Sequence, residues 1–404
     1  MKKIMLPIMS SVLGMSTLLS SQASAATTFK DVQANHWAKS AIESAVSKGY
    51  FKGYGNGLFK PNASVTRAEF ASLITRVAKE MPLSETGATD SFKDLEGHWS
   101  KAEVDRAVSL GFIQTKDYPN GFKPNTPITR EEMAKWMSSG LMASSEEYKK
   151  AFVETKDTLL PVKEAFKPGI KQDKLPYLAI AMGTNLMNGF PDGSFGMDKT
   201  TTRAESSAIL LRLENVLKKE VESFADLNEL RMVGTKKTNL ELVSSLTTGN
   251  TSIADISGKR KTFRNGTGSL VFHRLIGVNV SESKKKQSIY TSVFMTEYGQ
   301  EKYKNSGLLP VFKEITIYPK KQGFSIGDFK NGVIDKTSGM TITNKLNEKY
   351  GYEVLPTQDS VEFFAKYRNG VKIWVLEYMG LDDKEFAQFD MDDGSYAIIK
   401  KNAK

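Results

Sequence analysis

The chain has 404 residues, 40% of them hydrophobic and 25% charged, which is typical of a globular protein with two or three domains. It contains no cysteine, so disulfides, thiol chemistry and cysteine-bound zinc are excluded. A net charge of +10 favours an anionic partner.

Residues 1–25 have the features of a cleaved signal peptide. Lys2-Lys3 precede an apolar stretch from Ile4 to Leu19, and Ala23-Ser24-Ala25 is a small-residue cleavage site. No other stretch reaches the roughly 18 apolar residues of a membrane helix. We therefore expect an exported chain without a membrane span after cleavage, and an uncleaved N-terminal anchor is the alternative. Export also argues against nucleic acid as the anionic partner.

One short phrase occurs three times in the first half of the chain. Thr66-Arg67-Ala68-Glu69 returns as Thr129-Arg130-Glu131-Glu132 and as Thr202-Arg203-Ala204-Glu205. Thr-x-x-Glu is a capping box, in which the Thr hydroxyl and the Glu carboxylate bind backbone N–H groups of the first helical turn. Apolar residues at helical spacing follow each phrase, so three helices are predicted to begin there.

The arginine of each phrase has no such explanation. A cation in the first turn lies at the positive end of the helix dipole, where an anionic side chain is preferred. The sequence leaves two readings open: each Arg binds an anionic ligand, or each Arg pairs with a neighbouring carboxylate.

A longer pattern precedes the first two phrases. The first phrase is preceded by Phe29-Lys30-Asp31-Val32, by His36-Trp37 and by a predicted helix that ends at Gly49. The second phrase is preceded by Phe92-Lys93-Asp94-Leu95, by His98-Trp99 and by a predicted helix that ends at Gly111.

The third copy departs from this pattern. Asp173 stands where the first copy has Trp37, and Phe166-Lys167-Pro168 is the nearest echo of the Phe-x-Asp-Val segment. The second copy has Thr115 in place of Gly53.

This pattern resembles the S-layer homology (SLH) family. The resemblance implies three helical repeats packed as a pseudo-threefold spindle, which bind an anionic, pyruvylated secondary polysaccharide of a Gram-positive cell wall. It implies that the arginines of the three phrases and the Asp and Trp of the first two copies contact the polymer. The predicted binding residues are Arg67, Arg130, Arg203, Asp31, Trp37, Asp94 and Trp99. We expect Arg203 to matter less for binding, because its own repeat lacks the Trp and the Phe-x-Asp segment.

The chemistry of these residues agrees with that role. A guanidinium binds a carboxylate such as that of a pyruvate ketal through two hydrogen bonds, an indole offers a flat face to a sugar ring, and an Asp accepts sugar hydroxyl protons. His36 and His98 lack partners at metal-ligand spacing and are interpreted as structural. No metal and no cofactor is predicted.

The predicted domains are the signal peptide and three repeats at 26–80, 90–142 and 160–215, followed by a C-terminal domain at 234–404. Residues 81–90 are predicted to be a linker, and 143–165 a solvated helical excursion. The helix of the third phrase is expected to continue through Leu217 and Val221.

The C-terminal domain is predicted to be a small α+β or mainly-β domain. Its expected strands are 269–280, 288–295, 314–318 and 396–399, with a hairpin formed by 361–367 and 371–378 about Asn369-Gly370, and a helix at 343–350.

No catalytic or metal motif stands out in this domain. His273 is its only histidine, and Asp390-Met391-Asp392-Asp393-Gly394 lacks the glutamate that completes a calcium loop. Lys284-Lys285-Lys286 is interpreted as an exposed turn, with anion binding as the alternative.

Together these features predict a multidomain, secreted, non-enzymatic protein of the cell wall or S-layer. An all-α repeat region anchors it, and the C-terminal domain is displayed for structure or for binding an unknown ligand. Two alternatives remain open: an anchored wall hydrolase with its active site in 234–404, and an adhesin.

Overall fold

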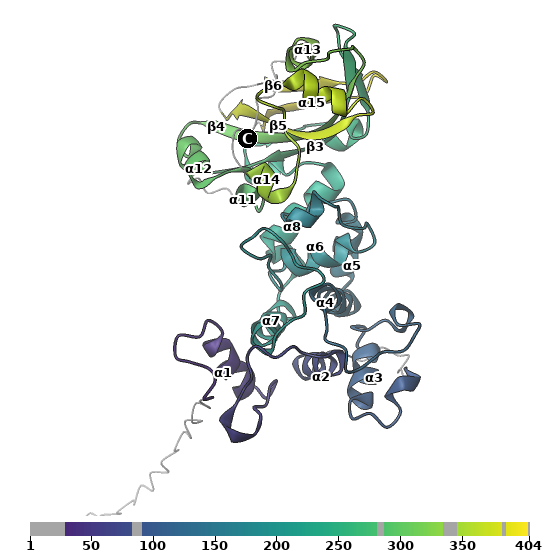
Figure 1. Cartoon of the computed structure of the whole chain (residues 1–404), viewed down its shortest axis with the longest axis vertical. Coiled ribbons are helices and arrows are strands. Elements are labelled where there is room, and N and C mark those ends of the chain that lie inside the picture. The colour runs from purple at the N-terminus through teal and green to yellow at the C-terminus, as the bar shows by residue number, and fades with distance from the viewer. Residues whose placement is uncertain (1–28, 83–90, 281–286, 334–345, 382–384, 403–404) are drawn as a thin grey trace, which may run out of the picture.

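The computed structural model describes residues 29–82, 91–280, 287–333, 346–381 and 385–402. The predicted signal peptide, most of the predicted linker and Lys284-Lys285-Lys286 lie outside these residues. A three-armed helical part lies at one end of the molecule and a sheet-containing body at the other (Figure 1).

The helical part is built from three pairs of helices. The helices that follow the repeated phrases are α2 (Arg67–Val77), α4 (Arg130–Ser144) and α7 (Arg203–Val216), and each begins with a complete capping box, as predicted. Their partners are α1 (Lys39–Ser47), α3 (Lys101–Ser109) and α6 (Leu175–Gly183).

The repeats interlock, because each partner helix packs on the phrase helix of a different repeat. Helix α3 packs against α2, α6 against α4, and α1 against α7 (Figure 1). Every cleft beside a phrase helix is therefore lined by side chains from more than one repeat.

A ring of backbone hydrogen bonds closes this arrangement at its centre. The residue before each capping threonine donates its N–H to the equivalent residue of another repeat. Val65 donates to Thr201 (3.0 Å), Thr201 to Ile128 (3.3 Å) and Ile128 to Val65 (2.9 Å). All three residues are buried, so these peptide groups have no access to water and the ring satisfies them.

The 143–165 segment is a packed helix rather than a solvated excursion. Helix α5 (Glu146–Glu154) buries Tyr148 and Ala151 against its neighbours. It also contacts α8 (Ala225–Lys236), a helix that the sequence did not predict.

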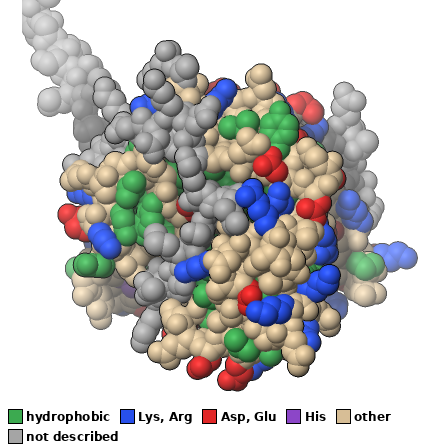
Figure 2. Space-filling model, turned by 90° about the horizontal axis from the view of Figure 1, so that it is seen from above, with side chains coloured by type: hydrophobic (Ala, Val, Ile, Leu, Met, Phe, Trp, Pro, Cys, Tyr) green, Lys and Arg blue, Asp and Glu red, His purple; other side chains and the backbone are tan. Residues whose placement is uncertain are grey.

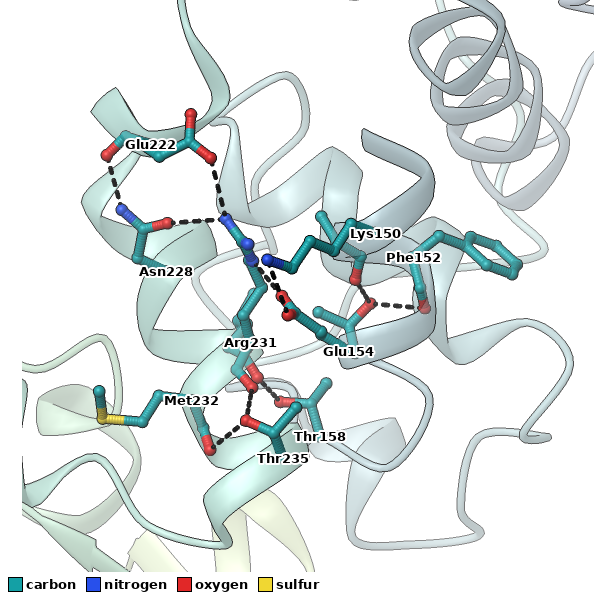
Figure 3. A network of polar contacts seen from close by, with 12 residues as sticks. Lys150, Phe152, Glu154, Thr158, Glu222, Asn228, Arg231, Met232 and Thr235 are labelled. Atoms are coloured by element: carbon teal, nitrogen blue, oxygen red, sulfur yellow. Dashed lines mark hydrogen bonds and ion pairs between the residues drawn. The ribbon is translucent and has the colours of Figure 1, made fainter. Parts of the chain in front are cut away.

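Polar contacts fix α8 to the segment around α5 (Figure 3). Arg231 Nε lies 2.5 Å from the Glu154 carboxylate, and its Nη1 contacts Asn228 and Glu222. Thr158 Oγ1 donates to the carbonyl oxygen of Leu230 at 2.7 Å.

The sheet-containing body that follows α8 consists of two antiparallel sheets and short helices, so its fold class is α+β. One sheet has the order β2-β3-β4-β5 and the other β1-β7-β6. The strands are β1 (Leu246–Thr247), β2 (Arg260–Thr262), β3 (Gly268–Gly277), β4 (Leu308–Pro319), β5 (Val371–Gly380), β6 (Glu385–Asp390) and β7 (Tyr396–Lys401). The helices are α9 (Leu240–Val243), α10 (Ile253–Ile256), α11 (Thr291–Phe294), α12 (Glu297–Tyr303), α13 (Ile326–Gly332), α14 (Leu346–Tyr350) and α15 (Ser360–Lys366).

The predicted strands at 269–280, 314–318, 371–378 and 396–399 are present in β3, β4, β5 and β7. The strands predicted at 288–295 and 361–367 are wrong, because these segments form α11 and α15. No hairpin forms about Asn369-Gly370: β5 pairs with β4, and Gly370 at φ +106° follows the end of α15.

The predicted domain boundary at residue 234 falls within a helix. Gly234 lies inside α8, while α7 ends at Val216 and a short 3₁₀ turn, Val221–Ser223, follows.

The body is joined to the third repeat by a mainly aromatic contact. Phe166 lies within 6.2 Å, between ring centroids, of Phe294, Tyr352 and Trp374. The buried Tyr290 hydroxyl donates to the Leu159 carbonyl at 2.6 Å.

Seen from the sheet end, Lys and Arg side chains gather along one side of this body (Figure 2).

The close approach of α8 to α5 gives a testable prediction. A Cβ added at Gly234 would lie 2.0 Å from the Glu154 carbonyl oxygen. We expect Gly234→Ala to lower the free energy of unfolding by about 1–3 kcal/mol, because the two helices must separate. Thermal unfolding would measure this loss.

Gly55→Ala is the matched control, because a Cβ at Gly55 meets nothing within 4 Å. Equal melting temperatures for the two variants would contradict the proposed close packing.

Candidate functional site

Each phrase arginine reaches into the loop of another repeat, and the three contacts run in a cycle. Arg203 donates from Nε to the Phe59 carbonyl (2.9 Å) and from Nη2 to the Lys52 carbonyl (2.8 Å). Arg130 makes the equivalent bonds to Phe195 (2.8 Å) and Asn188 (2.6 Å).

Arg67 departs from the other two. Its Nη1 donates to the Phe122 carbonyl at 2.9 Å, but Nε and Nη2 bind Glu132 Oε1 at 2.9 and 2.8 Å. Arg67 therefore pairs with a carboxylate, which was one of the two interpretations of the sequence. Backbone carbonyls bind Arg130 and Arg203 instead.

An aromatic ring supports each guanidinium. Arg203 lies 4.7 Å from the Tyr54 ring centroid, Arg130 lies 4.5 Å from that of Phe190, and Arg67 lies 5.0 Å from that of Tyr118. Burial lowers the pKa of Arg130 and of Arg203, while nearby carboxylates oppose this change. Both side chains stay cationic, because an arginine pKa starts far above neutral pH.

The predicted Asp residues hold the loops in place. Asp31 accepts the N–H groups of Phe59 (2.8 Å) and Lys60 (2.7 Å). Asp94 accepts those of Phe122 (3.0 Å) and Lys123 (2.7 Å) in the same way. Both lysines have positive φ, near 58° and 55°, so these bonds stabilise a backbone shape that a lysine rarely adopts.

The third repeat has its own version of this contact, which the sequence analysis missed. Glu164 accepts the N–H groups of Phe195 and Gly196, both at 2.9 Å. The structural counterpart of the Phe-x-Asp segment is therefore at 162–165, and Phe166-Lys167-Pro168 instead faces the sheet body.

Trp37 and Trp99 project into solvent. Their exposed fractions are 67% and 61%, which is unusual for the largest apolar side chain. His36 stacks on Trp37, whereas the His98 ring is tilted against Trp99. Both histidines accept a backbone N–H through Nδ1, His36 from Ala38 and His98 from Ser100. These contacts agree with the structural role predicted for the histidines.

Trp99 and Arg203 meet at one cleft, which we name the Trp99 cleft. Its volume is about 160 Å³. The first repeat supplies most of its wall. The second repeat supplies the Trp99 indole, and the third repeat supplies Arg203. Its lining is Phe51, Lys52, Val65, Glu69, Ser72, Leu73, Arg76, Trp99 and Arg203.

Arg76 is a cleft residue that sequence reasoning missed. It donates to the Tyr50 carbonyl (2.6 Å) and to Ser72 Oγ (2.9 Å). Arg212 occupies the same place in α7 and donates to the equivalent Leu186 carbonyl at 3.4 Å. The sequence shows this arginine at the same spacing after two of the three phrases, as Arg76 after Arg67 and as Arg212 after Arg203.

We infer two equivalent clefts from the correspondence between repeats. The positions of Trp99, Arg76 and Arg203 are taken by Trp37, Arg212 and Arg130 in the Trp37 cleft beside α7. They are taken by Asp173, Ser139 and Arg67 in the Asp173 cleft beside α4. Sequence reasoning grouped these residues by repeat, whereas the fold groups them across repeats.

Among the described residues, no group of three His, Cys, Asp or Glu is placed to hold a metal ion. Within the same part of the chain, no helix is both long and apolar enough to cross a membrane. In the sheet body, Glu314 is paired with Arg274 at 2.8 Å, and His273 Nε2 contacts Thr316 Oγ1 at 2.7 Å.

Comparison with known proteins supports the resemblance for part of the chain. Residues 28–71 and 91–134 match the S-layer homology domain family. The chain is 40% identical over 119 residues to cell surface glycoprotein 1 of Acetivibrio thermocellus, and 39% identical over 109 residues to the cellulosome-anchoring protein of that organism. These alignments cover 27% and 26% of this chain but only 5% and 24% of the relatives.

A longer alignment extends beyond the two matched repeats. The S-layer protein of Bacillus thuringiensis subsp. finitimus is 27% identical over 277 residues, which is 67% of this chain and 30% of that protein. The family match and these relatives bear out the predicted location of the chain at the cell surface.

The loop contacts give a prediction about stability. Asp94→Ala removes two hydrogen bonds from a charged acceptor and leaves Lys123 at positive φ without support. We expect a loss of about 1.5–3 kcal/mol in the free energy of unfolding. Chemical denaturation would measure it, with the exposed Glu96→Ala as the control.

The same carboxylate predicts a pH dependence. Burial alone would raise the pKa of Asp94, but the N–H donors of Lys123 and Phe122 outweigh it and lower the pKa. Its contribution to stability is therefore complete above about pH 4 and is lost as the pH falls through the lowered folded pKa. Asp94→Ala should lose part of the acid-induced destabilisation, and an unchanged acid limb would contradict this assignment.

Proposed function

We propose that the helical repeats anchor this protein non-covalently to the cell wall by binding an anionic, pyruvylated secondary polysaccharide. The observation that carries the proposal is the Trp99 cleft, where an exposed indole and two arginines from different repeats line one cavity. The matched family and the anchoring protein among the relatives support the same role.

The cleft offers the groups that an acidic sugar requires. A hexose ring is flat and apolar on one face, so it stacks on the exposed indole of Trp99. The guanidinium groups of Arg76 and Arg203 attract a carboxylate carried by that sugar. Because both are held by carbonyl oxygens, they lose little freedom when the ligand binds.

Asp31 and Asp94 act on the ligand indirectly in this proposal. They fix the loops whose carbonyls receive the arginines, so they position Arg203 and Arg67. Arg203 and Trp99, the tryptophan of the second repeat, line the same cleft. We therefore expect Arg203 to matter for polymer binding even though its own repeat lacks a tryptophan.

The predicted contact of Trp99 with the polymer can be tested without disturbing the fold. Trp99→Ala removes an exposed side chain, so the melting temperature should stay the same while wall binding weakens. Loss of an aromatic contact of about 0.5–1.5 kcal/mol corresponds to roughly 2- to 13-fold in affinity, and lost buried area adds to it. Co-sedimentation with purified wall sacculi would measure the change.

Tyr298→Ala is the matched control, because Tyr298 is an even more exposed aromatic residue in the sheet body. Sacculi stripped of their secondary polymer provide the second arm, and the wild-type chain should remain in solution with them. Pelleting with stripped sacculi would instead indicate that the wall glycan itself is bound, and would contradict the proposed anchor.

A further inference from the structure

The three clefts between repeats are not chemically equivalent, and we propose that the Asp173 cleft is closed by the protein's own Glu132, so that polymer binds only at the Trp99 and Trp37 clefts. This inference rests on the proposed function and adds to it the number and identity of the working clefts.

The first observation is the ion pair itself. Glu132 Oε1 lies 2.8–2.9 Å from both Nε and Nη2 of Arg67. These are the two nitrogens that Arg130 and Arg203 turn towards backbone carbonyls. A carboxylate bound to the guanidinium is the interaction proposed for the ligand, and Glu132 already supplies one to Arg67. The remaining Nη1 of Arg67 is bound by the Phe122 carbonyl, so all three of its nitrogens have partners within the protein.

The second observation is that the equivalent glutamates stay at their caps. Glu69 and Glu205 each accept the N–H of their own capping threonine at 2.8 Å. The corresponding distance from Glu132 to the Thr129 N–H is 3.4 Å. Glu132 therefore keeps a longer capping bond through Oε2, while its Oε1 turns towards Arg67.

A change in the second repeat's loop explains this turn. The loop from Thr115 to Phe122 is one residue longer than its counterparts and brings in Tyr118. The Tyr118 hydroxyl donates to Glu132 Oε1 at 3.0 Å and accepts a hydrogen bond from Trp136 Nε1 at 2.7 Å. These bonds hold the Glu132 carboxylate against the guanidinium.

The remaining residues of this cleft also disfavour an acidic sugar. Asp173 replaces the tryptophan, and Ser139 replaces the second arginine. Lys135 is paired with Asp117 at 2.7 Å, so its charge is compensated within the protein. The cleft thus lacks the flat apolar face and carries an additional negative charge.

The inference can be tested on the full-length mature chain with a methyl hexoside that carries a pyruvate ketal. The side-chain Nε–Hε signals of Arg67, Arg130 and Arg203 are assigned with single Arg→Lys variants and followed by NMR during titration. In the wild type, the signals of Arg130 and Arg203 should shift and that of Arg67 should not. Titration calorimetry should give two sites per chain.

Glu132→Ala should free Arg67, so that its signal also shifts and a third, weaker site appears. Glu132→Gln keeps the shape of the side chain and removes its charge, so it gives the same test if the alanine variant is unstable. Thr129→Ala is the matched control, because it removes the same capping box but leaves the ion pair intact. It should keep two sites.

Movement of the Arg67 signal in the wild type would overturn the inference. A silent Arg67 in both Glu132 variants would overturn it as well. If none of the three arginine signals moves in any variant, the anchoring function itself is contradicted.

Discussion

The ring of three backbone hydrogen bonds among Val65, Ile128 and Thr201 is the constraint on which the helical part depends. It fixes the residue before each capping threonine, and so sets where α2, α4 and α7 begin. Because the ring joins all three repeats, no repeat can complete it alone. The same geometry carries each phrase arginine to a loop of another repeat.

This arrangement explains why a cation is tolerated at the positive end of a helix. The unfavourable dipole is worth about 0.3–1 kcal/mol, whereas a hydrogen bond to a charged group contributes about 1.5–3 kcal/mol. Arg203 makes two such bonds to the loop at Lys52 and Phe59. The sequence offered a ligand or a carboxylate as the partner, and a backbone carbonyl of another repeat could not be foreseen without the interlocked fold.

The sequence predicted those elements whose signals are local. Capping boxes, helical spacing and long runs of β-branched residues identified α2, α4, α7, β3, β4 and β5. It failed where a short apolar segment was ambiguous, as at α15, whose Val361 is exposed and whose Phe364 is buried. It also placed the start of the C-terminal domain at Gly234, which lies inside the unpredicted helix α8, where the close approach of Glu154 requires a glycine. Of the site, it identified Arg and Trp but not Arg76 or the grouping across repeats.

The divergence of the third repeat has a structural reason in the contact with the sheet body. In the counterpart of the Phe-x-Asp segment, Val162 replaces the Phe and Glu164 supports the loop in place of the Asp. Phe166, which follows this segment, packs among Phe294, Tyr352 and Trp374. Surface that the first two repeats leave to solvent is thus used here to hold the second part of the chain. A repeat that loses its exposed tryptophan can still preserve its arginine, because Arg203 serves the cleft of its neighbours rather than its own. The surroundings of each of these residues are therefore set by the cleft to which it contributes, and not by the repeat in which it is encoded.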